Sequence, residues 1–266
     1  MPPFTESETE RWNAAIAVRR SRREFDSRPV PEADLDAIGA VCARFTPYPD
    51  ARVALVRHAP AGLFRGLVGS YGRVHGATSA LVFISRAESV TGSEHCGYIG
   101  QTAVLEATAR SLATCWIAGT FRSGVAADLV TLADGEVIRG VSPIGFAVAD
   151  PPGRERLVFG AGKPKRRRER DAIAPGAEAW PSWALAGVEA ARIAPSAMNR
   201  QPWRFRRSDD GSVVVSAAGV DTPRTALRLD CGIAMLHFEI AVRAQGADGA
   251  WETLDAPDVA RWVPAQ

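Results

Sequence analysis

The chain has 266 residues, of which 46% are hydrophobic and 23% charged, and its formal net charge is +2. This composition is typical of a globular protein with a sizeable core, and so small a net charge favours neither a nucleic-acid partner nor a membrane surface. The first residues, MPPFTESETERW, lack the basic and apolar regions of a signal peptide, and no apolar run is long enough to span a bilayer. We therefore expect a cytoplasmic protein.

The cysteines and histidines predict neither disulfides nor a metal site. The four cysteines are widely spaced in apolar surroundings, which favours buried free thiols in a reducing compartment. The four histidines are scattered, without the spacing of metal ligands. His237 falls within a helical pattern, so we interpret it as a packed helix residue and not as a catalyst. The cysteines are Cys42, Cys96, Cys115 and Cys231.

The first half of the chain predicts helices alternating with short strands. Residues 8–20 predict a helix capped by Thr9 or Ser7, and Pro31 opens a second helix, since proline is favoured in a first turn. Strands are expected over 52–57 and 80–85, with a helix over 61–72 between them. The longest helical pattern covers 94–113. A tight loop over 114–120, a short helix and a strand over 136–149 follow it.

The second half begins with a segment rich in Pro, Gly and Arg. This segment, residues 150–175, is interpreted as a linker around the basic run 163–170. A helix is expected over 180–194, and Asp209-Asp210-Gly211 predicts a hairpin between strands 203–207 and 212–217. Asp230 is expected to cap a helix that ends at Gly246. Residues 251–254 are expected to form a last edge strand.

The loop between helix 180–194 and the next strand, APSAMNRQPWRF, combines rigidity with polarity. Its two prolines fix φ and restrict the residues before them. Ser196, Asn199 and Gln201 add short hydrogen-bonding side chains. Such a loop can hold a flat heteroaromatic ring. It can equally be an ordinary proline-rich turn.

Two motifs resemble those of FMN-dependent nitroreductases. PSAMNRQPW resembles their P-S-x-x-N-x-Q-P-W loop, and RRSRREF, at residues 19–25, resembles their R-R-S-x-R-x-F segment on an N-terminal helix. In ordinary members the loop follows the segment closely, whereas here the two lie at opposite ends of the chain. The resemblance implies an α+β fold, with a three-layer α/β/α arrangement and mixed or antiparallel sheets.

A weak internal similarity suggests that the chain contains two copies of one half. Residues 35–45 and 185–195 each form a small-residue helix that leads into a proline-bearing loop and a short strand, and helices 100–112 and 232–244 are also similar. Family members are symmetric dimers that bind FMN at the interface, one subunit supplying the R-S-x-R contacts and the other the P-S-x-x-N loop. In this chain the first half has only Thr46–Asp50 as its loop, and the second has Glu178–Trp183 in place of the arginine segment.

Each half thus keeps what the other has lost, which predicts a fused pseudo-dimer with one flavin site. Its parts would be residues 1–160 with the arginine segment, 161–175 as the basic linker and 176–266 with the loop. The internal interface would take the place of the family's dimer interface. We therefore expect a monomer or a weak homodimer.

The resemblance also implies the residues that bind FMN. Arg19, Arg20 and Ser21 would hold the phosphate and the ribityl chain, and Arg23 would lie near the N1–C2=O edge, where a cation stabilises reduced flavin. The alternative for 19–23 is a solvated helix end, favoured by the helix dipole. One of Arg166, Arg167 and Arg168 would close the phosphate site. The remaining expected contacts are Pro195, Ser196, Ala197, Asn199 and Gln201 of the loop and, by position along the chain, Gly119 and Thr120 near flavin N5.

The function that the resemblance implies is an FMN-dependent oxidoreductase. NAD(P)H would pass hydride through flavin N5 to a small electron-poor acceptor, such as a nitro compound or a quinone. The sequence has no G-x-G-x-x-G turn, so the nicotinamide would bind transiently on the flavin. Two alternatives stay open: an FMN storage or sensor protein without turnover, and a structural homologue that has lost the flavin.

Overall fold

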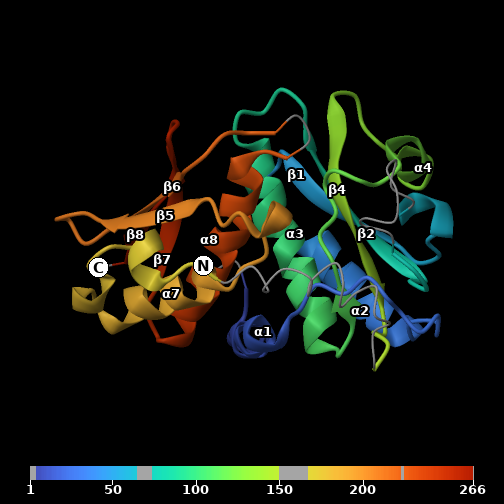
Figure 1. Ribbon diagram of the computed structural model, residues 1–266, viewed down its shortest axis with the longest axis horizontal. Helices are drawn as coiled ribbons and strands as arrows, with labels where there is room; N and C mark the ends of the chain where they lie inside the picture. The colour runs from blue at the N-terminus through green and yellow to red at the C-terminus, as the bar shows by residue number, and fades with distance from the viewer. Residues whose placement is uncertain (1–3, 65–73, 150–166, 223–224, 266) are drawn as a thin grey trace.

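The computed structural model describes residues 4–64, 74–149, 167–222 and 225–265. It contains two four-stranded antiparallel sheets, with strand orders β1-β2-β4-β3 and β5-β6-β8-β7. Figure 1 shows the two long helices, α3 and α8, side by side between the sheets. This is the expected α+β architecture, with antiparallel sheets.

The first half begins with a capped helix, but the cap is not the expected residue. Thr5 and Glu8 form a capping box, so the helix starts earlier than residues 8–20 indicated. Over 61–72 only a short 3-10 helix, η1, is described, and residues 65–73 lie outside the described part. The elements are α1 (Glu6–Val18), α2 (Glu32–Arg44), β1 (Ala51–Val56), η1 (Ala61–Phe64), β2 (Ser79–Arg86), α3 (Gly92–Ala109), β3 (Ala113–Thr114), α4 (Ser123–Asp128) and β4 (Glu136–Gly145).

In the second half the hairpin and both helices form as expected, with two differences. Asp230 does not cap α8, because the helix starts at Leu227 and encloses it. The expected last strand, 251–254, is an edge strand, but β8 follows it and pairs between β6 and β7. The elements are α6 (Arg170–Ile173), η2 (Ala177–Ala179), α7 (Ser182–Arg192), η3 (Ala197–Asn199), β5 (Trp203–Arg207), β6 (Val213–Ala217), α8 (Leu227–Ala244), β7 (Gly249–Thr253) and β8 (Asp258–Pro264).

The two halves repeat one topology. Each runs helix, strand, strand, long helix, strand, strand, and in each sheet the last strand pairs between the second and the third. The second strand of each sheet also carries a register shift, between Phe83 and Ile84 in one and between Val215 and Ser216 in the other. This repetition supports the interpretation of the chain as two fused copies.

The helices α3 and α8 cross at two glycines that occupy equivalent places. A Cβ on Gly97 would lie 2.1 Å from the carbonyl oxygen of Leu229, and a Cβ on Gly232 would lie 1.9 Å from that of Glu94. The two contacts are reciprocal, as a local two-fold axis requires. Gly97, three residues before the range 100–112 that resembles 232–244, is therefore the partner of Gly232.

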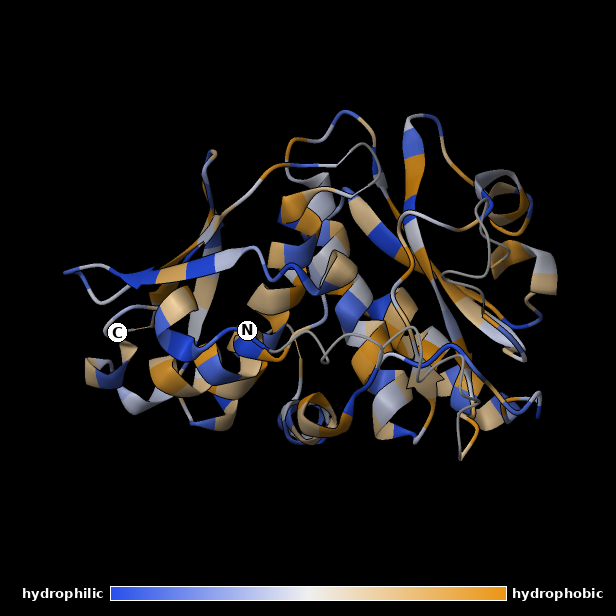
Figure 2. Cartoon of the chain, in the orientation of Figure 1, coloured by the Kyte–Doolittle hydropathy of each residue, from blue (hydrophilic) through white to orange (hydrophobic). Residues whose placement is uncertain are grey.

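One apolar core runs through both halves, from Trp12 to Trp262, and a second cluster lies on the other face of the first sheet, under η1 and α4. The central strand β2 is consequently buried on both faces, which gives the first half its helix–sheet–helix layering. Figure 2 shows apolar residues along the facing helices α3 and α8, and polar positions alternating along β5. No helix in the described ranges is long and apolar enough to cross a membrane.

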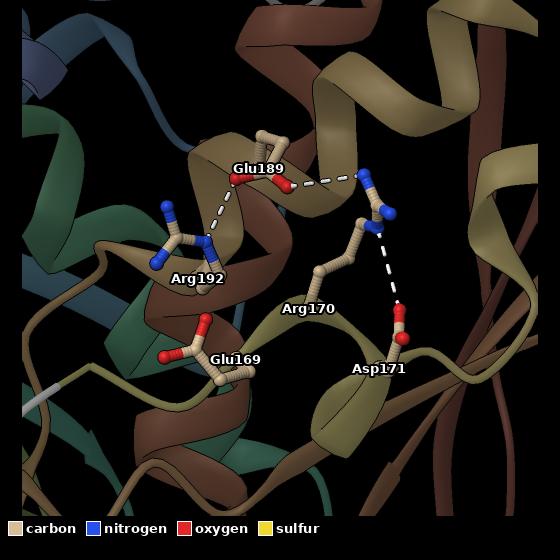
Figure 3. A pocket seen from close by; sticks show the side chains of 5 residues that line it. All are labelled: Glu169, Arg170, Asp171, Glu189 and Arg192. Carbon is tan, nitrogen blue, oxygen red and sulfur yellow. Dashed lines mark hydrogen bonds and ion pairs between the residues drawn. The ribbon is translucent and has the colours of Figure 1, made fainter.

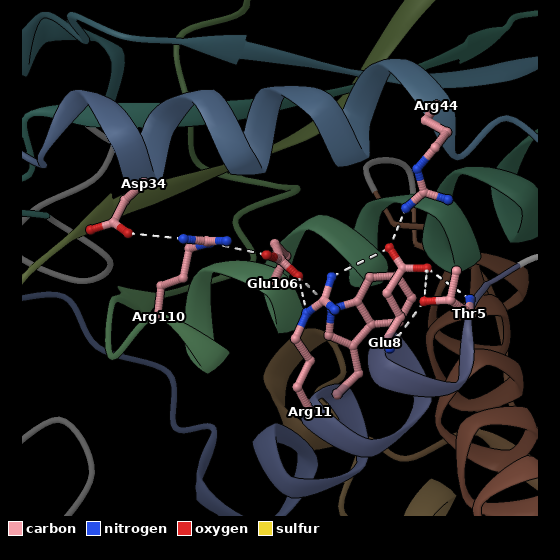
Figure 4. A network of polar contacts seen from close by, with 8 residues as sticks. Thr5, Glu8, Arg11, Asp34, Arg44, Glu106 and Arg110 are labelled. Carbon is pink, nitrogen blue, oxygen red and sulfur yellow. Dashed lines mark hydrogen bonds and ion pairs between the residues drawn. The ribbon is translucent and has the colours of Figure 1, made fainter.

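A polar network fixes helix α1 against α2 and α3 (Figure 4). The carboxylate of Glu106 is 1% exposed and accepts hydrogen bonds from Trp12 Nε1 (2.7 Å), Arg11 Nε (2.9 Å) and Arg110 Nε (3.0 Å). Although burial disfavours the ionised form, these donors lower the pKa of Glu106. Because α1 leads directly into the arginine segment, this network also sets where that segment starts.

Candidate functional site

The arginine segment leaves helix α1 as extended chain, and not on a helix as the resemblance implied. Arg19 is the first residue past α1. Ser21 then forms a bridge beside Thr114 of β3, and the N–H of Arg22 donates to the Thr114 carbonyl over 2.9 Å. Farther along, the N–H of His75 donates to the Arg23 carbonyl over 2.9 Å. The segment is thus tied to the first sheet by its backbone.

Arg19 is buried, which excludes the solvated helix-end interpretation for this residue. It is 5% exposed, and one of its terminal nitrogens donates a long hydrogen bond of 3.4 Å to Ser21 Oγ. Within the described ranges its Nε, also buried, has no hydrogen-bond partner. Burial, reinforced by the charge of Arg167, lowers the pKa of Arg19 to about 10. Arg20 is exposed and donates to the carbonyls of Ala17 and Arg19.

Arg167 connects the arginine segment to the loop at the other end of the chain. One of its terminal nitrogens donates to the Ala194 carbonyl (2.6 Å) and to Asn199 Oδ1 (3.0 Å). Burial lowers its pKa, and the charges of Arg20 and Arg192 add to the effect. Arg19, Arg167 and Asn199 are therefore brought into one region of the molecule.

Of the other candidates in the basic run, Arg168 has an exposed side chain, and its backbone N–H donates to Gln201 Oε1 over 2.8 Å. Arg166 lies outside the described residues. Among the described arginines of the run, Arg167 is thus the one whose guanidinium reaches the loop.

The loop itself has an uncommon backbone. Met198, Asn199 and Gln201 have φ angles of 50°, 55° and 49°, a left-handed conformation that costs free energy for residues other than glycine. Internal hydrogen bonds hold it. The N–H of Gln201 donates to Ser196 Oγ (3.0 Å), and its side-chain Nε2 donates to the Asn199 carbonyl (3.1 Å). Strained loops of this kind are typical of binding sites.

Asp230, in the first turn of α8, forms hydrogen bonds with two residues of the loop. It is 2% exposed; its Oδ1 accepts from the N–H of Ala197 (3.1 Å) and its Oδ2 from Arg200 Nε (2.7 Å). Burial raises the pKa of Asp230 to about 6, against the opposing charge of Arg200. Neither role was predicted from the sequence, although Arg200 lies inside the loop and the helical pattern had marked Asp230.

Residues 12–242 match the protein-family model described as "Putative TM nitroreductase". The chain belongs to this nitroreductase family. A search of curated proteins gives no match to the sequence.

The chain is also similar to solved structures. A Thermotoga maritima protein, described as a putative nitroreductase, is 21% identical, with a TM-score of 0.61 over 95% of this chain and 93% of that one. A nitroreductase with bound FMN from Bacteroides fragilis is 18% identical, with a TM-score of 0.43 over 56% of this chain and 91% of that one. The first of these likenesses covers nearly the whole chain and shows a similar fold.

A buried hydrogen-bonded chain crosses this nitroreductase beside the two arginines. Trp116 Nε1 donates to Gln101 Oε1 (2.8 Å), so the Gln101 amide nitrogen donates to His237 Nε2 (2.8 Å), and His237 Nδ1 donates to the Ala190 carbonyl (3.0 Å). Burial lowers the pKa of His237 to about 3, and the charges of Arg19 and Arg167 lower it further. The imidazole is therefore neutral, and the interpretation of His237 as a packed helix residue is confirmed.

Gly119 and Thr120 lie in the bend after Ile117, which pairs with Val141 of β4 through two backbone hydrogen bonds of 2.8 and 2.9 Å. Both are half-buried. Trp116 connects the start of this loop to α3 through Gln101. The role of Gly119 and Thr120 near the flavin stays a prediction.

A surface cavity of about 300 Å³ lies between α6 and α7 (Figure 3). Its lining is Glu169, Arg170, Asp171, Glu189 and Arg192. Glu189 accepts from Arg192 Nε (2.7 Å) and lies 3.9 Å from Arg170. With three carboxylates against two guanidiniums, this cavity does not favour an anionic cofactor. The pair formed by the buried Arg19 and the half-buried Arg167 does.

Proposed function

We propose that this nitroreductase is an FMN-dependent oxidoreductase that passes hydride from NAD(P)H to a small electron-poor acceptor, such as a nitro compound or a quinone. The observation that carries the proposal is the environment of Arg19. Its buried guanidinium faces the like charge of Arg167, and among the described residues neither forms an ion pair with a carboxylate. Two neighbouring cations without an acid, Arg19 buried and Arg167 half-buried, fit a phosphate monoester, which carries nearly two negative charges and accepts bidentate hydrogen bonds.

In this proposal the two ends of the chain hold the cofactor together. Arg19 and Ser21 would bind the phosphate from the first half, with Arg20 at the solvent side. Arg167, in the segment that connects the two halves, would also bind the phosphate. Its hydrogen bond to Asn199 would hold the loop in place beside it. A phosphate there would also provide acceptors for the Arg19 Nε, which is buried and unpartnered within the described ranges.

The ring system would lie against the loop and the first sheet. Pro195, Ser196 and Ala197 would present backbone and hydroxyl groups to its polar edge, and Gln201 would keep the loop closed through its bond to Asn199. Arg23 would lie near the N1–C2=O edge, and Gly119 with Thr120 near N5, as the resemblance implies. When bound, FMN supplies the hydride chemistry itself. The chain accordingly needs no general acid, and the neutral His237 offers none.

We further propose that each chain binds one flavin. The place equivalent to the PSAMN loop in the first half is occupied by the protein's own side chains. Tyr48 stacks on His95 with ring centroids 3.8 Å apart and planes at 4°, and His95 Nδ1 lies 2.7 Å from Asp50 Oδ1. A carboxylate at this position repels a phosphate. The helices α3 and α8 would then play the part of the family's dimer interface within a monomer.

An absorption spectrum of the purified protein tests the proposal. The expected result is the two-banded spectrum of oxidised flavin, at one FMN per chain, that bleaches when NADH or NADPH is added without oxygen and recovers with a quinone. Retained flavin that neither nucleotide bleaches would instead favour a storage or sensor protein. A colourless protein that takes up no added FMN would mean that the flavin site has been lost.

A further inference from the structure

The reciprocal contact of Gly97 with Gly232 assigns equivalent positions along α3 and α8. It pairs Glu94 with Leu229, and therefore His95 with Asp230 and Cys96 with Cys231. Both cysteines are buried free thiols, as expected of equivalent places in one interface. His95 and Asp230 thus lie at the same point of the two halves, each in the first turn of its long helix.

Each of these residues holds the loop that precedes the first strand of its own half. His95 binds Asp50, whose other carboxylate oxygen accepts from Ser89 (2.5 Å) and Thr91 (3.1 Å). Asp230 binds the Ala197 N–H and Arg200. The polarity of the pair is reversed between the halves: the acid lies in the loop of the first half and on the helix of the second.

Because of this reversal, the loop of the first half carries a negative charge and the loop of the second half does not. In the second half the acid lies beneath the loop, at 2% exposure, and Arg200 turns toward it and toward the Ala226 carbonyl (2.9 Å). The loop itself then carries Ser196 and Asn199 and no carboxylate. In the first half the loop itself carries the acid, Asp50, and Tyr48 stacks on the His95 that binds it.

We propose that Asp230, acting through Arg200 and the Ala197 N–H, is the positioning residue of the flavin loop. It holds the loop in the backbone conformation, left-handed at Met198, Asn199 and Gln201, that the cofactor contacts need. Burying an ion pair seldom adds stability over apolar residues of the same size, but it does fix one arrangement. That the loop binds FMN rests on the proposed function. That Asp230 holds the loop rests on its hydrogen bonds to Ala197 and Arg200.

The charged and titratable neighbours of Asp230 leave Arg200 as its partner. Arg228, two residues earlier on α8, is paired with Glu94 of α3. Cys231, beside it on α8, has its pKa raised by burial and stays a thiol. The carboxylate thus acts on the loop through Arg200 and Ala197.

The test compares Asp230→Asn with Asp50→Asn, its matched control in the other half. FMN binding is followed by quenching of flavin fluorescence, and hydrogen exchange of peptides covering 195–201 is followed without FMN. Asp230→Asn keeps an acceptor for Ala197 but sets an amide against Arg200. We expect FMN affinity to fall about tenfold or more, exchange in the loop to quicken and the melting temperature at pH 7 to stay or rise. Asp50→Asn should change neither loop exchange nor affinity.

A second variant, Arg200→Gln, should reproduce the loss, and the double variant should lose little more, because the two residues act as one pair. Unchanged affinity in Asp230→Asn, or an affinity loss that only follows a matching loss of global stability, overturns the proposal. If the wild-type protein binds no FMN, the proposed function fails by itself. In that case unchanged loop exchange would also overturn the positioning role, and faster exchange would support it.

Discussion

Gly97 and Gly232 occupy equivalent places where helices α3 and α8 cross, and each faces the backbone of the other helix. A Cβ would lie 2.1 Å from Leu229 O in one case and 1.9 Å from Glu94 O in the other. Neither obstacle is a side chain that could move aside. The contact therefore sets the distance between the two helices, and with it the distance between the halves that carry the arginine segment and the loop.

Gly97→Ala should destabilise the protein by about 3 kcal/mol or more, at the upper end of overpacking effects, because the added methyl group must push two helix backbones apart. Urea unfolding followed by tryptophan fluorescence measures this. The matched control is Gly124→Ala in α4, where an added Cβ meets nothing within 4 Å; it should gain roughly 0.5–1 kcal/mol from helix propensity. Equal effects of the two substitutions would show that the helix crossing is not tightly packed.

Much of the fold could be predicted from local patterns. The periodicity of α3 and α8, the turn at Gly211 and the alternation of β1 each follow from nearby residues, and each element formed close to its expected bounds. Two features were missed for different reasons. The strand β8 pairs with β7 beside it and with β6, which is distant in the sequence. The cap at Thr5 was missed although Glu8, its reciprocal partner, is only three residues away and the pair forms a local capping box.

The candidate site shows the same division. The resemblance identified the arginine segment and the loop, but the sequence could not say which arginine of the basic run turns inward, since burial decides that. Asp230 was expected to act as a helix cap because it lies at the start of a helical pattern, where an aspartate commonly caps the helix. Its partner Arg200 is thirty positions away, and only the packing of α8 under the loop brings the two together.

Arg19→Ala should weaken FMN binding by about 1–3 kcal/mol, roughly 5- to 150-fold, through loss of a buried charge-assisted contact. Ser21→Ala should fall in the same range. Arg170→Ala is the control, because that side chain is 34% exposed and faces Asp171 and Glu189; it should change affinity far less. Isothermal titration of the flavin-free variants with FMN gives these values. Equal losses in all three would mean that general positive charge binds the cofactor.

His237 should stay neutral from pH 5 to pH 8. Its pKa in the folded protein is lowered to about 3 from an ordinary 6.5, so the unfolded chain binds the proton first, and this residue's contribution to stability is lost as pH falls below about 6.5. NMR of the imidazole, assigned by comparison with His237→Gln, should show no titration in this range. A midpoint between pH 5 and pH 8 would contradict the buried chain from Trp116 to Ala190.

Asp230 should show the opposite dependence. Its folded pKa is raised to about 6 from 3.8, so protonation favours the folded state, and the stability contributed by the protonated group is lost as pH rises through about 6. The difference in unfolding free energy between wild type and Asp230→Asn should therefore shift toward the variant by on the order of 2 kcal/mol between pH 4 and pH 7. Wild-type FMN affinity should fall as pH drops through about 6, because the proton removes the charge that holds Arg200. A pH-independent difference in stability would show that Asp230 does not titrate there.

Asn199 and Tyr48 test whether one flavin site survives in each chain. They lie in the loops that precede β5 and β1, at corresponding points of the repeated topology. Asn199 accepts from Arg167 (3.0 Å), so Asn199→Ala should release that arginine and lower flavin content, with an affinity loss of about 1–3 kcal/mol. Tyr48→Ala removes a ring that stacks on His95, which should reduce stability and leave the flavin at one per chain. Native mass spectrometry counts the flavins directly. Two FMN per chain, in wild type or in Tyr48→Ala, would show that the second place binds cofactor after all.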